Sequence, residues 1–131
     1  MNTFHLQIVT PEGCPFEGQA EALRLMTSEG YVSIRAHHAD YIATLDIGIV
    51  TLTVDGNARD AACGGGFLTV EGGNVRLVAT SFEYAENIDK FRAEQAKSLA
   101  EKILASSKEE KDIALAKMRL ARALNRLKIA K

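Results

Sequence analysis

Glycine and proline are absent from the sequence between Ala85 and the last residue. Because these two residues most often end helices, nothing interrupts a helical pattern there. The apolar residues of this stretch recur at three- and four-residue steps, which predicts amphipathic helices. The expected apolar faces are Ile88, Phe91, Ala96, Leu99 and Ile103 in the first half and Ile113, Ala116, Leu120, Ala123, Leu124 and Leu127 in the second.

A break between two helices is predicted at residues 106–110. Ser107 is followed three residues later by Glu110, a pattern in which a hydroxyl and a carboxylate satisfy the free backbone amides of a new helix start. Apolar faces of similar length on either side of the break favour an antiparallel hairpin in which each helix covers the other.

Two further absences limit the class of protein. No apolar run approaches the length of a membrane span, and the first residues lack the basic start and apolar core of a secretory signal. We therefore expect a protein that is made and kept in the cytoplasm. The cysteines, Cys14 and Cys63, have neither metal-ligand spacing nor, in that compartment, an oxidising environment, so we expect ordinary thiols.

Residues 1–84 contain short runs of alternating apolar and polar residues between turn residues, which predicts β-strands. The expected strands are residues 3–9, 23–26, 31–34, 49–54, 58–62, 67–70 and 75–79. Asp55-Gly56 is typical of a tight hairpin turn, and strands at this spacing favour a sandwich or flattened barrel. The predicted fold class is α+β with segregated parts: a β-sandwich domain over residues 1–84 and a helical hairpin over residues 85–131.

Charge is divided unequally between the two parts. Residues 1–84 hold 4 Lys and Arg against 10 Asp and Glu, whereas residues 85–131 hold 12 against 7. No acidic residue follows Asp112, so we expect the end of the last helix to bind an anionic surface. Its basic residues are Lys117, Arg119, Arg122, Arg126, Lys128 and Lys131.

Three patterns that could carry chemistry are weak in this chain. Gly64-Gly65-Gly66 precedes a strand, whereas phosphate-binding glycine loops lead into a helix, so a bulge or a close backbone approach is the better interpretation. His37, His38 and Asp40 lack the second cluster of ligands that a metal site needs. No pairing of a nucleophile with a base is recognisable.

One polar set on the helices allows two interpretations. Arg92 lies inside the first expected apolar face with Asp89 beside it, and Arg119, Arg122 and Arg126 flank the second face at helical spacing. Across a hairpin, the guanidinium groups could bind the phosphates of a nucleotide while Asp89 accepts a hydrogen bond from its ribose or adenine. The other interpretation is an ordinary i,i+3 ion pair beside a solvated basic stripe.

The succession of short motifs resembles the epsilon subunit of bacterial F-type ATP synthases along the full chain. Matching segments in the first part are Ile8–Glu12, Ser28–Gly30, His38-Ala39, Gly64–Val70, Asn74-Val75 and Val78-Ala79. In the second part, Ile88-Asp89 followed by Arg92-Ala93 is similar to the family's ATP-binding helix motif, and Ala121–Leu127 is similar to its last helix. The loop Ile34–Asp40 departs from the family by lacking two prolines and a glycine.

The resemblance implies a flattened sandwich of roughly ten strands and a helical hairpin in a non-catalytic subunit of the central stalk that needs no cofactor. The implied partners are the gamma subunit and the c-ring, which bind the sandwich, and the catalytic alpha/beta head, whose ATP hydrolysis the hairpin inhibits. ATP is implied as a regulatory ligand that favours the folded hairpin. The implied location is the cytoplasmic face of the membrane, reached only through the complex.

The resemblance also assigns roles to individual residues. The implied nucleotide-binding residues are Glu83, Ile88, Asp89, Arg92, Ala93, Arg122 and Arg126. Contact with the rotor ring is implied for Tyr31 and His38. Contact with the beta subunit is implied for Lys108, Lys111, Lys117, Arg119 and Arg122.

Two other classes of protein are alternatives. The acid-free last helix would suit a stand-alone nucleotide-sensing or nucleic-acid-binding module, but that helix lacks aromatic residues on which bases could stack. A small metal-dependent enzyme built on His37, His38 and Asp40 would lack both ligands and a base. We therefore expect neither nucleic acid nor a metal ion as a ligand.

Overall fold

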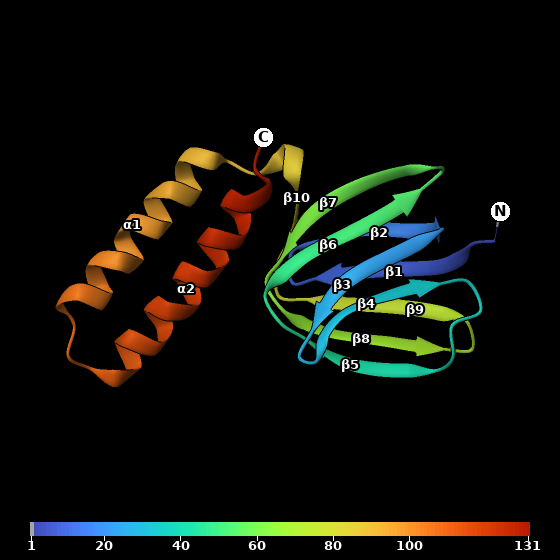
Figure 1. The fold of residues 1–131 in the computed structure, drawn as a ribbon, viewed down its shortest axis with the longest axis horizontal. Helices are drawn as coiled ribbons and strands as arrows, with labels where there is room; N and C mark the ends of the chain where they lie inside the picture. Colours follow the sequence, from blue (N-terminus) through green and yellow to red (C-terminus); the bar gives the residue numbers. More distant parts are fainter. Residues whose placement is uncertain (1) are drawn as a thin grey trace. The chain divides into compact units, whose positions relative to one another are not determined.

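The computed structural model describes residues 2–131, and the chain divides into two compact units, one ending at Tyr84 and the other spanning Ala85–Lys131. The first unit consists of strands and the second of helices (Figure 1). The strands are β1 (Phe4–Thr10), β2 (Gly13–Ala20), β3 (Ala22–Thr27), β4 (Gly30–Arg35), β5 (Tyr41–Leu45), β6 (Gly48–Val54), β7 (Asn57–Cys63), β8 (Gly66–Glu71), β9 (Asn74–Ala79) and β10 (Phe82–Tyr84). The helices are the 3-10 helix η1 (Ala85–Asn87), α1 (Lys90–Ser106) and α2 (Glu110–Ile129).

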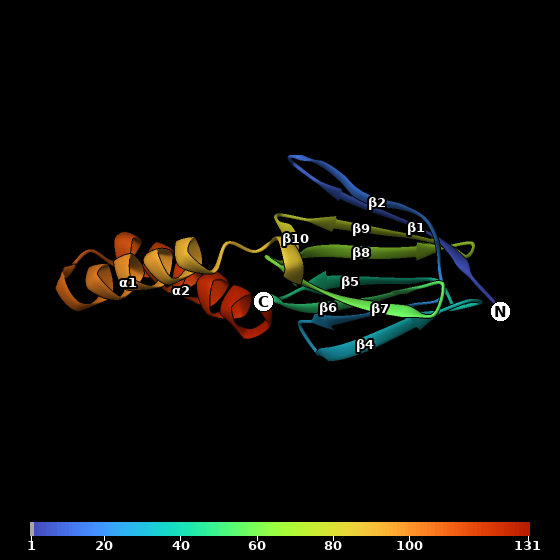
Figure 2. The same ribbon diagram turned by 90° about the horizontal axis from the view of Figure 1, so that it is seen from above.

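The ten strands form one hydrogen-bonded sheet that folds into two facing layers (Figure 2). Neighbouring strands follow the order β10-β7-β6-β3-β5-β8-β9-β1-β2, and β4 pairs with β3. The pairs are antiparallel except for β1 with β9, which is parallel. The layers join where β3 meets β5 at Thr27 and Leu45. The sandwich predicted from the alternating pattern is therefore confirmed.

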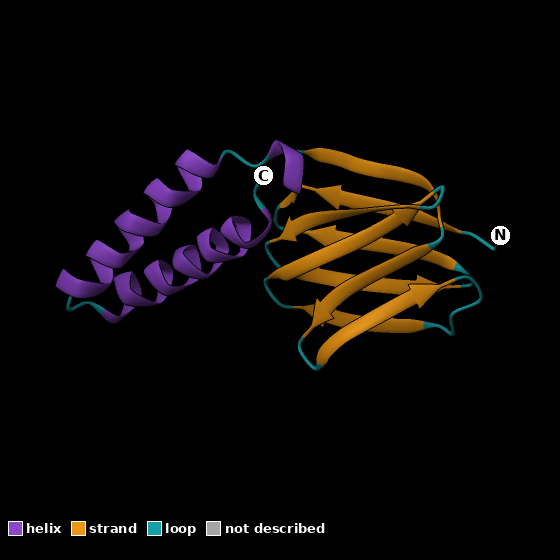
Figure 3. Cartoon of the chain, turned by 45° about the horizontal axis from the view of Figure 1, so that its top comes forward, coloured by secondary structure: helices purple, strands orange, loops and turns teal. Residues whose placement is uncertain are grey.

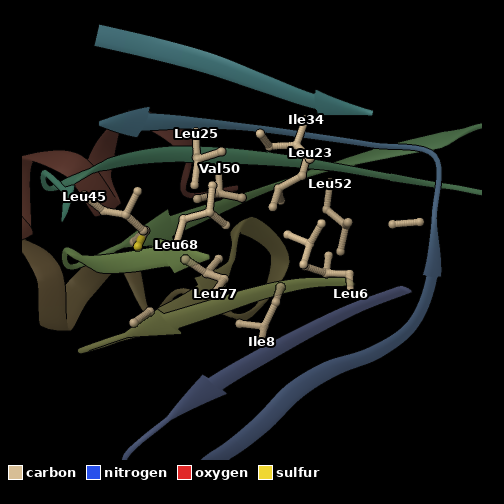
Figure 4. Close-up of a cluster of buried hydrophobic side chains, with 14 of the residues drawn as sticks. Leu6, Ile8, Leu23, Leu25, Ile34, Leu45, Val50, Leu52, Leu68 and Leu77 are labelled. Atoms are coloured by element: carbon tan, nitrogen blue, oxygen red, sulfur yellow. The ribbon is translucent and has the colours of Figure 1, made fainter. Parts of the chain in front are cut away.

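Side chains from both layers meet in one hydrophobic core (Figure 4). In β1 the buried residues are Phe4, Leu6 and Ile8, as period-two alternation predicts for a strand with one solvated face. The same alternation recurs in β3, β6, β8 and β9. The largest fully buried side chains are Leu6, Ile8, Leu23, Leu25, Ile34, Val50, Leu52, Leu68 and Leu77.

Three strands lie outside the set predicted from the sequence: β2, β5 and β10. Pro15 and Gly18 break the alternation in β2, and the strand tolerates them because it pairs only with β1 at an edge of the sheet. β10 has only 3 residues and pairs with β7. Strands of this kind depend on their neighbours more than on their own pattern.

The glycine run between β7 and β8 lies where two backbone segments approach closely. Gly66 has a φ of +146°, and a Cβ atom at this position would overlap the carbonyl group of Val78 on β9. The neighbouring backbone is tied across the same corner by hydrogen bonds from Gly64 N to Ser81 O and from Thr80 N to Gly65 O. Close approach, rather than phosphate binding, accounts for these glycines.

The two helices run antiparallel and are joined by Ser107–Glu109 (Figure 3). The buried alanines of the pair recur at seven-residue spacing, Ala93 and Ala100 on α1 and Ala116 and Ala123 on α2. The apolar face expected for α1 is wrong at two positions, because Phe91 and Leu99 are 67% and 58% exposed, whereas Ile88 is buried. Small side chains let two helix axes approach closely, which accounts for buried alanines where Phe91 and Leu99 stay exposed.

The expected cap at the start of α2 is also wrong. The N-cap of α2 is Glu109, whose side chain makes no capping hydrogen bond. Ser107 instead ends α1, and its hydroxyl accepts a hydrogen bond from the backbone N–H of Glu109 at 3.3 Å. The serine shapes the connection between the helices rather than the start of the second one.

Candidate functional site

The beginning of α1 and the end of α2 lie at the same end of the antiparallel pair (Figure 1). This arrangement brings Asp89, Arg92 and Ala93 to the end of the hairpin that also carries Arg122 and Arg126. Ile88 directly precedes Asp89, so six of the seven residues implied for nucleotide binding share one end of the helical unit.

Asp89 has a defined structural role at this end. It is the N-cap of α1, and its carboxylate oxygen Oδ1 accepts a hydrogen bond from the backbone N–H of Arg92 at 3.1 Å. The carboxylate therefore contacts the backbone of Arg92 and not its guanidinium group, so the i,i+3 ion pair is not formed. The side chain of Arg92 is exposed, which corrects its expected place inside the apolar face.

Arg122 carries the one buried polar side-chain atom that has no hydrogen-bond partner within residues 2–131, the guanidinium Nε. A buried N–H group without an acceptor is costly, and an arginine N–H prefers an anionic oxygen. Arg126 lies one helical turn further along α2 and is half-buried. Guanidinium groups at i,i+4 lie on the same side of a helix, so both can reach one anion.

Three of the residues implied for the nucleotide, Glu83, Ile88 and Ala93, offer other contacts than the polar groups above. Ile88 and Ala93 are buried and can offer only apolar contact. Glu83 lies on β10 in the β unit, where it pairs in register with Ala62 and is half-buried. The polar groups of the helical unit that could bind a nucleotide are thus Asp89, Arg92, Arg122 and Arg126.

Tyr31 and His38, implied for the rotor ring, lie in and after strand β4. Tyr31 is 44% exposed, and the Cζ atom of Arg24 lies 3.9 Å from the centroid of its ring. The His38 ring packs edge-on against Tyr41 with a centroid distance of 5.7 Å, and its Nδ1 atom lies 2.7 Å from the carbonyl oxygen of Ala39. The contact between Arg24 and Tyr31 depends on the β3–β4 register, so the sequence alone does not reveal it.

The residues implied for the beta subunit are spread along the hairpin. Lys108 lies in the connection, and Lys111, Lys117 and Arg119 are exposed on α2. Arg119 lines a groove near the connection, together with Ser106, Ser107 and Asp112 from the ends of the two helices. Arg119 therefore lines the end of the hairpin near the connection, whereas Arg122 and Arg126 lie nearer the opposite end.

Within the described part of the chain, no three His, Cys, Asp or Glu side chains gather closely enough to hold a metal ion. Neither α1 nor α2 combines the length and apolar character that crossing a membrane requires, nor does the other helix within residues 2–131. Burial raises the pKa of the Cys63 thiol, which keeps it protonated, whereas Cys14 is exposed.

Comparison with protein families matches both parts of the chain. The family described as "ATP synthase, Delta/Epsilon chain, beta-sandwich domain" matches residues 3–85, and the one described as "ATP synthase, Delta/Epsilon chain, long alpha-helix domain" matches residues 86–131. An ATP synthase epsilon chain of Ruminococcus albus is 37% identical over 131 residues, covering 99% of this chain and 98% of that protein. That of Bacillus velezensis is 39% identical over 130 residues, with 99% and 98% covered.

Solved structures share the fold. A chain of the Euglena gracilis mitochondrial ATP synthase superposes with a TM-score of 0.81 at 20% identity and covers 95% of this chain and 79% of its own length. A chain of the Tetrahymena thermophila mitochondrial ATP synthase central stalk and c-ring superposes with a TM-score of 0.62 at 13% identity, covering 97% and 96%. At sequence identities of 20% and 13%, these comparisons show a shared fold and nothing further.

Proposed function

The chain belongs to the ATP synthase Delta/Epsilon chain family, and we propose that it works as the non-catalytic epsilon subunit of an F-type ATP synthase. The observation that carries this proposal is the match of both family domains, in order, over residues 3–131, together with curated epsilon chains at 37% and 39% identity over nearly their whole length. In this role the chain couples rotation of the c-ring to ATP synthesis in the catalytic head. Its location is then the cytoplasmic face of the membrane, held there by the complex.

The outer face of the β5-β8-β9-β1 layer supports a stable contact with another subunit, which we assign to gamma. Phe67 is 47% exposed and pairs in register with Val78, which pairs with Val9 on the next strand. These three apolar side chains form a row across adjacent strands. Ile42 on β5 is 78% exposed, and a patch of this kind marks an interaction surface.

The helical hairpin supports a switch between two states. Its fully buried apolar residues on α1 and α2 are alanines, each of which buries little apolar area, so separating the helices costs less than it would with a seam of buried leucines. ATP bound by Asp89, Arg92, Arg122 and Arg126 would favour the folded hairpin, because a ligand shifts an equilibrium only when it binds one state more tightly. Falling ATP would then release the hairpin.

The released hairpin would act as a brake on ATP hydrolysis. Residues 85–131 carry 12 Lys and Arg against 7 Asp and Glu, which suits an acidic surface on the catalytic head. We assign this contact to Lys108, Lys111, Lys117, Arg119 and Arg122, four of which are exposed. Tyr31 and His38 are assigned to the rotor ring.

Two experiments test the two levels of this proposal. Co-purification of the chain with the gamma subunit tests the stalk role, and a gamma subunit that passes through a column of this chain without retention would overturn it. Calorimetric titration with MgATP tests the switch, with Arg92→Ala as the test variant and Lys102→Ala as a control cation elsewhere on α1. Loss of binding heat in Arg92→Ala alone is expected, and equal heats in all three proteins would remove the nucleotide site.

A further inference from the structure

Half of the basic residues of the acidic β unit lie together on one pair of strands. Residues 1–84 contain no lysine and 4 arginines, Arg24, Arg35, Arg59 and Arg76. Arg24 lies on β3 and Arg35 on β4, both on the outer face, because the residues beside them, Leu23, Leu25 and Ile34, are buried in the core.

The β3–β4 register makes the two arginines diagonal neighbours. Arg24 lies opposite Ser33, and Arg35 follows two residues later opposite Ala22. Diagonal neighbours of this kind have Cα atoms about 7–8 Å apart, within reach of one acidic segment. Within residues 2–131, no carboxylate pairs with either guanidinium group.

Tyr31 fixes the orientation of Arg24. The guanidinium Cζ atom lies 3.9 Å from the Tyr31 ring centroid, so the flat face of the guanidinium group is covered while its N–H edge stays available. A stacked guanidinium group loses less conformational freedom when it binds a carboxylate than a free one does. The guanidinium group of Arg24 is therefore already oriented before a partner binds.

Strand β4 also presents an unpaired backbone edge. It hydrogen-bonds to β3 on one side and, in the part of the chain that the structure describes, has no partner strand on the other. Alternate N–H and C=O groups of Gly30–Arg35 are thus free to pair with a strand from another chain. A segment added there would place every second side chain on the outer face, beside Arg24 and Arg35.

We propose that the β4 edge binds an extended acidic protein segment, which pairs with the backbone of Gly30–Arg35 and places carboxylates against Arg24 and Arg35. The charge of the two arginines selects an acidic segment, and the open edge selects an extended one. If the rotor ring is the neighbour of Tyr31, as proposed above, the segment belongs to the ring. The surface itself is inferred from β3 and β4 alone and stands without that assignment.

The test uses the full chain and a labelled ten-residue peptide in which glutamate alternates with threonine or valine. Amide hydrogen exchange should slow along Gly30–Arg35 when the peptide binds. Arg24→Gln and Arg35→Gln should each weaken binding about fivefold, the effect of losing one exposed charge pair. Arg35→Lys, which keeps the charge, should weaken it less.

Arg76→Gln is the matched control, because Arg76 is an exposed arginine on β9 in the other layer. If Arg76→Gln weakened peptide binding equally, the effect would come from the net charge of the protein and not from the β3–β4 surface, and the proposal would be overturned. Peptide binding without protection of β4 would also overturn it. The chain could instead bind phosphatidylglycerol vesicles through Arg24 and Arg35 and fail to bind the peptide. That result would overturn the proposal and identify a lipid surface as the ligand. Failure of the peptide would leave the stalk role intact, since that role is tested by gamma binding.

Discussion

The carboxylate of Asp89 accepts a hydrogen bond from the backbone N–H of Arg92 at 3.1 Å, which makes the same aspartate the start of α1 and a candidate nucleotide ligand. The hydrogen bond uses Oδ1 and leaves the second carboxylate oxygen available for a ligand. A substitution of Asp89 can therefore affect both helix stability and nucleotide binding. The two effects have to be separated by choosing the replacement.

Asp89→Ala and Asp89→Asn should separate these two roles. Alanine removes the cap and should lower the stability of the helical unit by about 1 kcal/mol, whereas asparagine caps as well as aspartate and should leave it unchanged. Both should weaken MgATP binding, because neither supplies a negatively charged acceptor. Thermal unfolding followed by circular dichroism and MgATP calorimetry measure the two effects. Wild-type affinity in Asp89→Asn would assign Asp89 to helix capping alone.

The alanine contact of the hairpin should be sensitive to added volume. Ala100 is buried on α1, so Ala100→Leu should destabilise the helical unit by about 1–3 kcal/mol by forcing the helices apart. The adjacent residue provides the control: Leu99 is 58% exposed, and Leu99→Ala should change stability by about 0.5 kcal/mol or less. The helical signal of the full chain on heating reports both. A larger loss from Leu99→Ala would mean that the large residue, and not the alanine, makes the contact.

Gly66 should tolerate no side chain. Its Cβ atom would overlap the Val78 carbonyl group, so Gly66→Ala should destabilise the β unit by about 3 kcal/mol or more. Gly72 also has a positive φ, +57°, but nothing lies within 4 Å of its Cβ position. Gly72→Ala should therefore cost only about 1 kcal/mol of backbone strain. Denaturant unfolding of both variants measures the difference, and equal costs would place the whole effect in backbone conformation.

The two cysteines should differ in reactivity. Cys14 is exposed and should react with a thiol reagent in the native protein, whereas Cys63 is buried and should react only after unfolding. At pH 8 a disulfide reagent should therefore modify one thiol in the native chain and two in guanidinium chloride. Fast modification of Cys63 in the native state would show that the core opens locally.

Cys63 should also make stability depend on pH at the alkaline end. Burial raises the pKa of its thiol in the folded chain above the ordinary value of 9.0. Above pH 9 the unfolded chain then loses this proton while the folded chain keeps it, so the free energy of unfolding falls as pH rises. Below pH 9 the contribution is fully present. In Cys63→Ala the decline should be shallower than in the wild type, and identical slopes would contradict it.

Several features of this protein could be predicted from the sequence because they depend on residues close together in the chain. The strands with regular alternation, such as β1 and β6, were predicted within a few residues, and Asp55-Gly56 forms the expected turn with positive φ at both residues. The helical hairpin follows from the absence of glycine and proline after Ala85 together with the apolar periodicity. The order of short motifs was sufficient to indicate the family.

Other features were decided only by tertiary structure, since they depend on which distant residues become neighbours. The sequence could not show that alanines, rather than Phe91 and Leu99, face the second helix, because the choice depends on how closely two helix axes approach. Nor could it reveal the stacking of Arg24 on Tyr31, which the β3–β4 register creates. Periodicity specifies the elements of a chain, whereas packing between elements specifies which side chains are left free to bind a partner.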